Sequence, residues 1–284
     1  MKGGGKMPGK LYIVGTPIGN LGDMSPRALE TLESCDFIAA EDTRVTLKLL
    51  NHFEIKKPMI SYFEHNRREK GEVILERILS GETCALVTDA GMPAVSDPGE
   101  DLVRLCHENG VTVNVVPGPS AFVAAAALSG MNVGRFTFEG FLSVNKPGRR
   151  EHLQSIRHEK RTMIFYEAPH KLSATLCDLY ECLGDREIAI VREITKIHEQ
   201  VIRTTLKEAS ERFKEEPLKG EIVLVIAGES EDAEEEYTLS QAVELAGQYI
   251  KDGMSPSLAA KQAAKQTGIK KGDIYKSLLE GEES

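Results

Sequence analysis

The chain has 284 residues, of which 41% are hydrophobic and 28% are charged, and its formal net charge is −9. This length predicts about two domains with an ample hydrophobic core. The sequence has no run of about 18 apolar residues and no charged-then-apolar leader, so we expect no membrane span, no signal peptide and a cytoplasmic location.

Residues 11–120 alternate between strand-like and helix-like patterns, which predicts an N-terminal α/β domain with a mostly parallel sheet and helices on both faces. A flexible N-terminus, residues 1–10, precedes it. The expected strands are 11–16, 36–41, 58–63, 83–88 and 111–116, and the expected helices are 26–34, 43–52, 68–80 and 99–109.

A second α/β domain is expected over residues 121–229, where more hairpin-like spacing predicts a mixed sheet. Its expected strands are 135–141, 161–166, 186–192, 200–205 and 221–227, and its expected helices are 121–129, 149–159, 171–183 and 206–214.

The remaining residues predict an acidic linker, 230–238, and a small helical unit, 239–284. Seven acidic residues and no basic one lie between Glu229 and Glu244, so this segment supplies most of the negative charge. In the helical unit, Ser255 and Pro256 form a helix-start signature, and a Gly turn near Gly268 separates two helices. This pattern resembles a helix-turn-helix; RNA docking and a merely structural helical bundle are both open interpretations.

Four apolar runs in the first 120 residues are each followed at once by a motif turn. The turns are GTPIGN (15–20), EDTR (41–44), DAGMP (89–93) and PGPSA (117–121). Because the loops beyond the carboxyl ends of parallel strands meet at one sheet edge and bind the ligand there, we expect the four turns to converge on a site.

The composition of these turns narrows the ligand. Neither G-x-G-x-x-G nor G-x-x-x-x-G-K-[ST] occurs, and three of the four turns lack Lys and Arg. Prolines at positions 17, 93, 117 and 119 remove backbone donors that a phosphate cradle would use. The turns offer tight curvature, small side chains and the carboxylate of Asp89, which favours a flat ligand that is neutral or positively charged.

The motifs LYIVGTPIGNLGD, AAEDTR, DAGMPAVSDPG, VVPGPSA, FEGFL, FYEAPHKL, REITK and GEIVLVIAG occur in this order from about Lys10 onward. Together they resemble the ribosomal RNA small subunit methyltransferase I family, within the tetrapyrrole-methylase superfamily of S-adenosylmethionine-dependent enzymes. The resemblance implies two α/β domains with the cofactor in the cleft between them, and a homodimer. It also implies methyl transfer to the ribose 2′-oxygen of a cytidine in 16S rRNA, with the RNA or the small ribosomal subunit as partner.

With that resemblance, S-adenosylmethionine is the expected cofactor at the strand-end turns. Small residues there let a ligand approach the backbone. The expected cofactor-binding residues are Pro17, Gly19, Asp89, Gly91, Met92, Pro93, Pro117, Ser120, Ala121, Phe165 and Tyr166.

The acceptor side needs groups that position RNA and take up the hydroxyl proton. We expect catalytic roles for Lys196, Glu167 and Asp42, with Lys196 as the base. The expected substrate-binding residues are Asn20, Arg44, His65, Arg149 and Arg150. Structural alternatives stand beside them: Asp42 and Arg44 can pair to fix their loop, Glu193 can pair with Lys196, and a loop histidine or a basic cluster is commonly just solvated surface.

Two other function classes remain open from the sequence. One is a superfamily relative that methylates a tetrapyrrole or another small acceptor, and the other is a non-catalytic RNA-binding protein with the same fold. The motifs AAEDTR and FYEAPH and the lysine-rich end of the chain argue against the first, and the intact turns argue against the second. Five cysteines without C-x-x-C spacing predict reduced structural thiols and no metal site.

Overall fold

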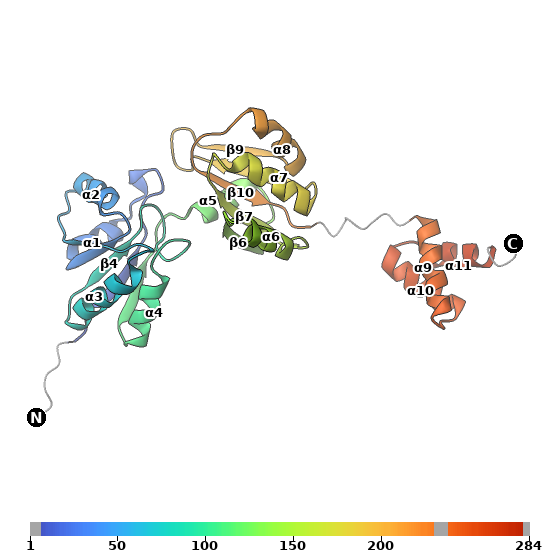
Figure 1. Cartoon of the computed structure of the whole chain (residues 1–284), viewed down its shortest axis with the longest axis horizontal. Helices are drawn as coiled ribbons and strands as arrows, with labels where there is room; N and C mark the ends of the chain where they lie inside the picture. The colour runs from blue at the N-terminus through green and yellow to red at the C-terminus, as the bar shows by residue number, and fades with distance from the viewer. Residues whose placement is uncertain (1–6, 230–237, 281–284) are drawn as a thin grey trace, which may run out of the picture. The chain divides into compact units, whose positions relative to one another are not determined.

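The computed structural model describes residues 7–229 and 238–280, and the chain divides into two compact units, residues 1–228 and 229–284 (Figure 1). Residues 1–6 of the expected N-terminal segment and 230–237 of the expected linker lie outside the described residues. Lys10, which we had assigned to the N-terminal segment, is the first residue of the first strand.

The first sheet has five parallel strands in the order β3-β2-β4-β1-β5. The strands are β1 (Lys10–Val14), β2 (Phe37–Ala40), β3 (Met59–Ser61), β4 (Cys84–Val87) and β5 (Thr112–Val116). The intervening helices are η1 (Leu21–Asp23, a 3-10 turn), α1 (Pro26–Ser34), α2 (Thr43–His52), α3 (Arg67–Leu79) and α4 (Glu100–Glu108).

Both faces of this sheet are covered, because successive strand residues point to opposite sides. Leu11 and Leu86 pack with α3 and α4 on one face, while Val14, Ala85 and Val87 pack with α1 and α2 on the other. The fully apolar runs FIAA and CALV, buried along their whole length, are typical of parallel strands covered on both sides. The predicted parallel sheet is confirmed.

The second sheet is mixed, as the sequence predicts, in the order β6-β7-β10-β8-β9. Strands β6 and β7 are parallel, and the other neighbours are antiparallel. The strands are β6 (Phe136–Phe141), β7 (Thr162–Glu167), β8 (Glu187–Arg192), β9 (Gln200–Thr205) and β10 (Ile222–Ile226), and the helices are α5 (Ala121–Ser129), α6 (Lys146–Ser155), α7 (Leu172–Leu183) and α8 (Leu206–Glu215).

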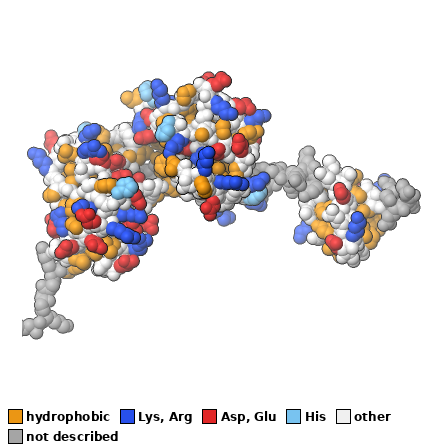
Figure 2. Space-filling model, in the orientation of Figure 1, with side chains coloured by type: hydrophobic (Ala, Val, Ile, Leu, Met, Phe, Trp, Pro, Cys, Tyr) orange, Lys and Arg blue, Asp and Glu red, His pale blue; other side chains and the backbone are white. Residues whose placement is uncertain are grey.

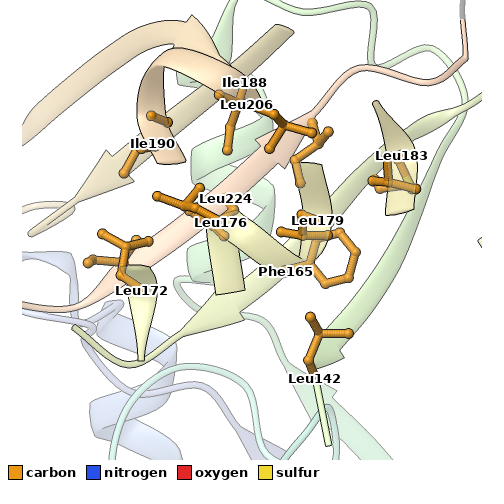
Figure 3. Close-up of a cluster of buried hydrophobic side chains, with 14 of the residues drawn as sticks. Leu142, Phe165, Leu172, Leu176, Leu179, Leu183, Ile188, Ile190, Leu206 and Leu224 are labelled. Carbon is orange, nitrogen blue, oxygen red and sulfur yellow. The ribbon is translucent and has the colours of Figure 1, made fainter. Parts of the chain in front are cut away.

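The largest hydrophobic cluster lies between this sheet and helices α6, α7 and α8. Leucines of α7 project onto Phe165 and Leu224 of the strands (Figure 3). On the opposite face, α5 packs against β7, β8 and β10, and Ile18 from the first motif turn belongs to that cluster. Ile18 therefore anchors the GTPIGN turn to the second sheet.

The second unit contains helices α9 (Leu239–Lys251), α10 (Pro256–Thr267) and α11 (Lys271–Glu280) in its described part. They pack around a core of small side chains, notably Ala246, Ala260 and Ala263, together with Ile274. A capping box joins Thr238 and Gln241 at the start of α9, and Gly268 ends α10 in the left-handed conformation. Ser255 occupies the predicted N-cap of α10, but its side chain makes no capping hydrogen bond.

One predicted element was misplaced. The expected helix 149–159 is α6, which begins at Lys146 and ends at Ser155. Pro147 and Gly148 suggest a turn, but the Asn145 side chain accepts a hydrogen bond from the Gly148 amide and caps the helix. Proline within the first turn is compatible with a helix because its missing N–H would have no partner there.

Candidate active site

The four motif turns meet at the carboxyl edge of the first sheet, as predicted. Thr16 and Gly91 exchange two backbone hydrogen bonds of 2.9 and 3.1 Å, which join the GTPIGN turn to DAGMP. The amide of Gly118 lies 3.3 Å from Sδ of Met92, which brings PGPSA onto the same turn. These contacts link segments that are about 75 and 26 residues apart in sequence.

The approach is close enough to require glycine. A Cβ on Gly15 would lie 2.6 Å from Cα of Gly118 and 2.7 Å from Sδ of Met92. Because the first of these neighbours is backbone, it has little freedom to move aside. The glycines in GTPIGN and PGPSA therefore allow two loops to cross in contact.

Carboxylates connect the second turn to the third. The Glu41 carboxylate accepts hydrogen bonds from the Thr88 hydroxyl and the Asp89 amide, and the Asp42 amide donates to the Asp89 carboxylate over 3.1 Å. Burial, followed by the nearby Glu41 carboxylate, raises the pKa of Asp89. The DAGMP turn is thus held by an acidic network on its β2 side.

A cavity of about 400 Å³ lies against these turns and the edge of the second sheet. This volume is in the range of small-molecule and cofactor sites. Its lining residues are Ile18, Ala90, Gly91, Met92, Val95, Ser96, Asp97, Ser120, Ala121, Phe122, Phe141, Tyr166, Glu167, Ala168, Pro169, Ile194, Glu221, Ile222 and Val223.

The charged side chains among these lining residues are the carboxylates of Asp97, Glu167 and Glu221. Glu221 pairs with Lys196, and Glu167 is buried and accepts hydrogen bonds, so Asp97 is the carboxylate of the three whose charge is least compensated. Burial, followed by the charges of Glu41 and Asp89, raises the pKa of Asp97 to about 6, although a hydrogen bond from Thr88 acts in the opposite direction. The cavity therefore favours a cation over an anion.

Aromatic side chains form one wall of the cavity. Phe122 stacks on Phe138 with ring centroids 4.3 Å apart, and the Tyr166 hydroxyl lies 3.3 Å from the Phe122 amide. The register of β6 against β7 shifts between Phe138 and Gly140, and Gly140 has a φ of +64°. Bulges of this kind redirect the next side chain, which here is Phe141, 58% exposed and 5.5 Å from the Tyr166 ring centroid.

The loop 193–199 between β8 and β9 packs over the GTPIGN turn. A Cβ on Gly19 would lie 2.6 Å from Cγ of Lys196, so the glycine makes room for the lysine stem. The Lys196 ammonium lies 3.0 Å from carboxylate oxygens of both Glu193 and Glu221. Glu193 and Thr195 have φ of 52° and 67°, a strained conformation for side chains other than glycine.

The expected cofactor residues fall into three groups. Gly91, Met92, Ser120, Ala121 and Tyr166 line the cavity. Pro117 lines a shallower depression next to Thr195. The others are not part of the cavity lining: Pro17, Gly19, Asp89 and Pro93 lie in the converging turns, and Phe165 is buried in the core on the far side of β7.

Of the expected catalytic residues, Glu167 alone lines the cavity. Both of its oxygens are engaged, by the Ala168 amide at 2.7 Å and by the Thr175 hydroxyl. Burial alone would lower the pKa of Lys196, but hydrogen bonds to Glu193 and Glu221 raise it, which counts against a neutral amine base. Hydrogen bonds from the Arg44 side chain and amide lower the pKa of Asp42 to about 2. All three base roles stay predictions.

The expected substrate-binding residues are dispersed. Asn20 caps the 3-10 turn η1, and His65 is an exposed residue in the loop after the edge strand β3. The Arg44 side chain is 87% exposed, yet its guanidinium pairs with Asp42 over 2.6 Å. Arg149 pairs with Asp178 over 2.6 Å, whereas Arg150 is exposed on α6. The structure thus brings Arg149 and Arg150 together on α6 and leaves Asn20 and His65 on separate loops and Arg44 in the first turn of α2.

Sequence reasoning missed several cavity residues. Asp97 and Phe141 lie within the motifs DAGMPAVSDPG and FEGFL, so the motifs themselves were the available signal. Ile194, Glu221 and Val223 come from the far half of the chain, and their place in the cavity follows from the pairing of β8 with β10.

Two further observations concern the described residues. They contain no group of three or more His, Cys, Asp and Glu side chains arranged to hold a metal ion. No helix among them combines the length and the apolar character needed to cross a bilayer.

The sequence profile of the Tetrapyrrole (Corrin/Porphyrin) Methylases matches residues 10–210. The chain is 46% identical over 273 residues to "Ribosomal RNA small subunit methyltransferase I" of Synechocystis sp., covering 96% of this chain and 98% of that protein. It is 44% identical to the Bacillus subtilis protein of the same name, covering 94% and 93%. The Thermotoga maritima protein of that name is 48% identical over 220 residues, which are 78% of this chain and 99% of that relative.

Solved structures share the fold. Uroporphyrin-III C-methyl transferase from Thermus thermophilus, "complexed with S-adenyl homocysteine", superposes with a TM-score of 0.56 at 18% identity, covering 77% of this chain and 97% of that one. Cobalt precorrin-4 methyltransferase superposes with a TM-score of 0.58 at 20% identity, covering 77% and 94%. At these identities the likeness establishes the two-sheet fold and leaves the substrate open.

Proposed function

The chain belongs to the ribosomal RNA small subunit methyltransferase I family of tetrapyrrole methylases, and we propose that it transfers a methyl group from S-adenosylmethionine to the ribose 2′-oxygen of a cytidine in 16S rRNA. The observation that carries this proposal is the cavity at the strand ends, with apolar and aromatic walls and carboxylates as its charged groups. Such a site suits a ligand with a flat ring system and a sulfonium cation.

The residues of the cavity fit the cofactor by their chemistry. Gly91, Ser120 and Ala121 leave the backbone accessible, and Asp97 offers negative charge. When bound, S-adenosylmethionine supplies a methyl group already activated by the positively charged sulfur. The protein's task is to keep the cavity dry and to hold the two reactants in line.

Positioning is the larger part of that task. Aligning two reactants can lower a barrier by about 7–11 kcal/mol, whereas a general base contributes roughly 10²–10⁴-fold, about 3–5 kcal/mol. Lys196 is ion-paired with Glu193 and Glu221, and Glu167 accepts two hydrogen bonds. These interactions hold the neighbouring loops in place, which agrees with alignment being the larger contribution. We therefore propose that the protein accelerates methyl transfer chiefly by aligning the methyl donor with the ribose hydroxyl.

The test is transfer of a labelled methyl group to small ribosomal subunits, and to the naked RNA, from cells that lack this protein. We expect incorporation at one nucleotide, and we expect the phosphodiester on the 3′ side of that ribose to resist alkaline cleavage because its 2′-hydroxyl is methylated. Subunits from cells that contain the protein are the matched control, because their site is already modified. Incorporation into a base carbon or nitrogen, or into neither substrate, would contradict the proposal. Ribosomal RNA as substrate also supports a cytoplasmic location.

We further propose that the protein is a homodimer. Helix α5 is apolar all round, yet Val123 and Leu128 on it are 52% and 41% exposed. The preceding strand β5 is an edge of the first sheet and presents Val115, which is 55% exposed. A helix that is apolar on every side is normally buried on every side, and an open edge strand is normally protected, so a second copy is a fitting partner.

A further inference from the structure

A groove of about 860 Å³ borders the cavity on the second domain. The linings of the two are consecutive in sequence at two places. Phe141 belongs to the cavity and Leu142 to the groove, and likewise Pro169 belongs to the cavity and His170 to the groove. The groove therefore begins where the cavity ends.

The groove carries exposed cations. Lys146, Arg150 and Lys171 line it, are exposed, and have no ion-pair partner in the described part of the chain. The acidic lining residues are Asp178, which is paired with Arg149, and Glu181. Figure 2 shows blue side chains gathered over the part of the surface that α6 forms in Figure 1. Phosphate binding needs local positive surface of this kind, whatever the net charge of the chain.

The floor of the groove is tied to the cavity. Arg149 donates hydrogen bonds to Asp178 at 2.6 Å and to the Thr175 hydroxyl at 2.9 Å, and Thr175 donates in turn to Glu167 at the cavity wall. This chain of bonds fixes α6 against α7. Arg149 therefore has a structural role in the groove, and the cations that are available to a ligand are Lys146, Arg150 and Lys171.

Phe141 stands at the junction. The shifted register after Phe138 and the left-handed Gly140 turn its ring toward the cavity rim, where more than half of its surface is exposed. An exposed aromatic ring is a platform on which a nucleobase of any identity can stack. A cationic groove beside an exposed aromatic ring is the combination by which proteins bind single-stranded nucleic acid.

We propose that this groove holds a single-stranded segment of the substrate RNA next to the target nucleotide, with its phosphates on Lys146, Arg150 and Lys171 and one base stacked on Phe141. The inference rests on the proposed function, because the target ribose must reach the cavity for methyl transfer. It places this RNA segment on the second domain, where the sequence-predicted contact Arg150 lies, whereas the predicted contacts Asn20, Arg44 and His65 belong to the first domain.

The first experiment reverses the charges of the groove in the full chain. The double variant Lys146→Glu/Arg150→Glu is compared with Lys48→Glu/Lys214→Glu, which changes the net charge equally at exposed lysines outside the groove lining. Binding of an unstructured oligocytidine of about twelve nucleotides is measured at several salt concentrations. We expect roughly tenfold or greater loss of affinity in the groove variant alone, and a salt slope reduced by about 0.7 for each lost phosphate contact.

The second experiment compares Phe141→Ala with Phe141→Tyr. Loss of one stacked base should weaken binding of the oligocytidine by roughly five- to 150-fold, and the tyrosine should restore it because it keeps the ring. S-adenosylhomocysteine affinity, measured by calorimetry, and melting temperature are recorded on each variant. If the alanine variant loses cofactor affinity and keeps RNA affinity, Phe141 belongs to the cofactor site and the stacking proposal is wrong.

The outcomes separate this proposal from the function on which it rests. Methyl transfer by the unaltered protein together with equal RNA affinity in groove and control variants would overturn the groove and leave the function intact. Absence of transfer by the unaltered protein would overturn the function itself. Weakened binding to assembled subunits with unchanged binding to the oligocytidine and to naked RNA would assign the groove to a protein partner and overturn the proposal as well.

Discussion

At the scale of single residues, Asp97 stands out among the three carboxylates that line the cavity, because its environment differs most from that of a solvated surface carboxylate. It lies against an apolar wall, close to Glu41 and Asp89, and its pKa is raised to about 6. Such groups cluster at functional sites because an uncompensated carboxylate lowers stability unless a ligand offsets it. We therefore expect the Asp97 carboxylate to bind the cofactor through its positive charge.

Replacing Asp97 with Asn should weaken binding of S-adenosylmethionine about ten- to 100-fold at pH 8, the loss typical for one charged hydrogen-bonding partner. S-adenosylhomocysteine, which lacks the sulfonium charge, should lose less. In the unaltered protein, the affinity for S-adenosylmethionine should fall as the pH drops through 6, because protonation neutralises the carboxylate. Calorimetry with both ligands between pH 5 and 8 checks this, and equal losses for both would contradict a charge-based role.

The stability of the same variant supplies its control. Because the folded-state pKa of Asp97 is raised from 3.8 to about 6, ionisation opposes folding: the penalty is absent below about pH 3, grows as the pH rises from there to about 6, and is constant above. Asp97→Asn should thus be more stable than the unaltered protein at pH 8, by on the order of 1 kcal/mol after solvent screening is allowed for, and equal to it at about pH 3. A destabilised variant at pH 8 would show that Asp97 is structural.

Arg44 offers a second test at this scale. Its guanidinium is exposed and makes a bidentate pair with Asp42, beside the α2 start. Exposed pairs contribute little to stability. Arg44→Ala should therefore leave the melting temperature and cofactor affinity nearly unchanged, while methylation falls and the salt dependence of RNA binding becomes shallower if Arg44 holds a phosphate. Joint loss of stability and cofactor affinity would instead assign Arg44 to fixing its loop.

At the scale of elements, the sequence pattern predicts those helix and strand bounds that depend on residues close together in the chain. Strands and helices follow from apolar runs bounded by turn residues, and all ten strands of the two described sheets lie within two residues of their predicted bounds. The start of α6 was not predictable from Pro147 and Gly148 alone, because it depends on a capping bond from Asn145. The ion pair of Lys196 with Glu221 was not predictable either, because Glu221 lies just before β10, which pairs with β8 from farther along the chain.

The contact of this loop with the GTPIGN turn can be tested by a double-mutant cycle. Gly19→Ala places a methyl 2.6 Å from Cγ of Lys196, so it should lift the loop and lower both melting temperature and cofactor affinity. Lys196→Ala removes Cγ, and the double variant should recover part of the loss, with a coupling free energy of about 1 kcal/mol. Additive effects would mean that Gly19 and the Lys196 side chain do not contact each other in solution. The contact of Gly19 with Thr195 and the backbone strain at its φ of +153° remain in the double variant, which is why only part of the loss is recovered. Gly15→Ala, which meets backbone instead, should find no such rescue.

At the scale of the whole molecule, the cavity is formed by segments that are far apart in the sequence, and local sequence patterns do not show that these segments meet. The four turns could be placed at one edge because parallel strands share a direction, and the contacts of Thr16, Gly91 and Gly118 agree. The opposite wall could not be placed, because Phe141 depends on a bulge and Val223 on antiparallel pairing in a second sheet. The tetrapyrrole methylase profile matches residues 10–210, all within the first unit, and the Thermotoga relative aligns over 78% of this chain and 99% of its own length.

The proposed dimer can be tested at the exposed apolar side of α5. If the apolar side of α5 is the contact between copies, Val123→Asp should place a charge in a desolvated interface and shift the protein from dimer to monomer. Val144→Asp is a matched control, since Val144 is 80% exposed and lies on the loop before α6, away from α5. Sedimentation equilibrium gives the mass of each variant. A dimer that survives Val123→Asp with unchanged affinity would rule out this surface, while a monomeric variant that still binds S-adenosylhomocysteine would show that one copy holds a complete cofactor site.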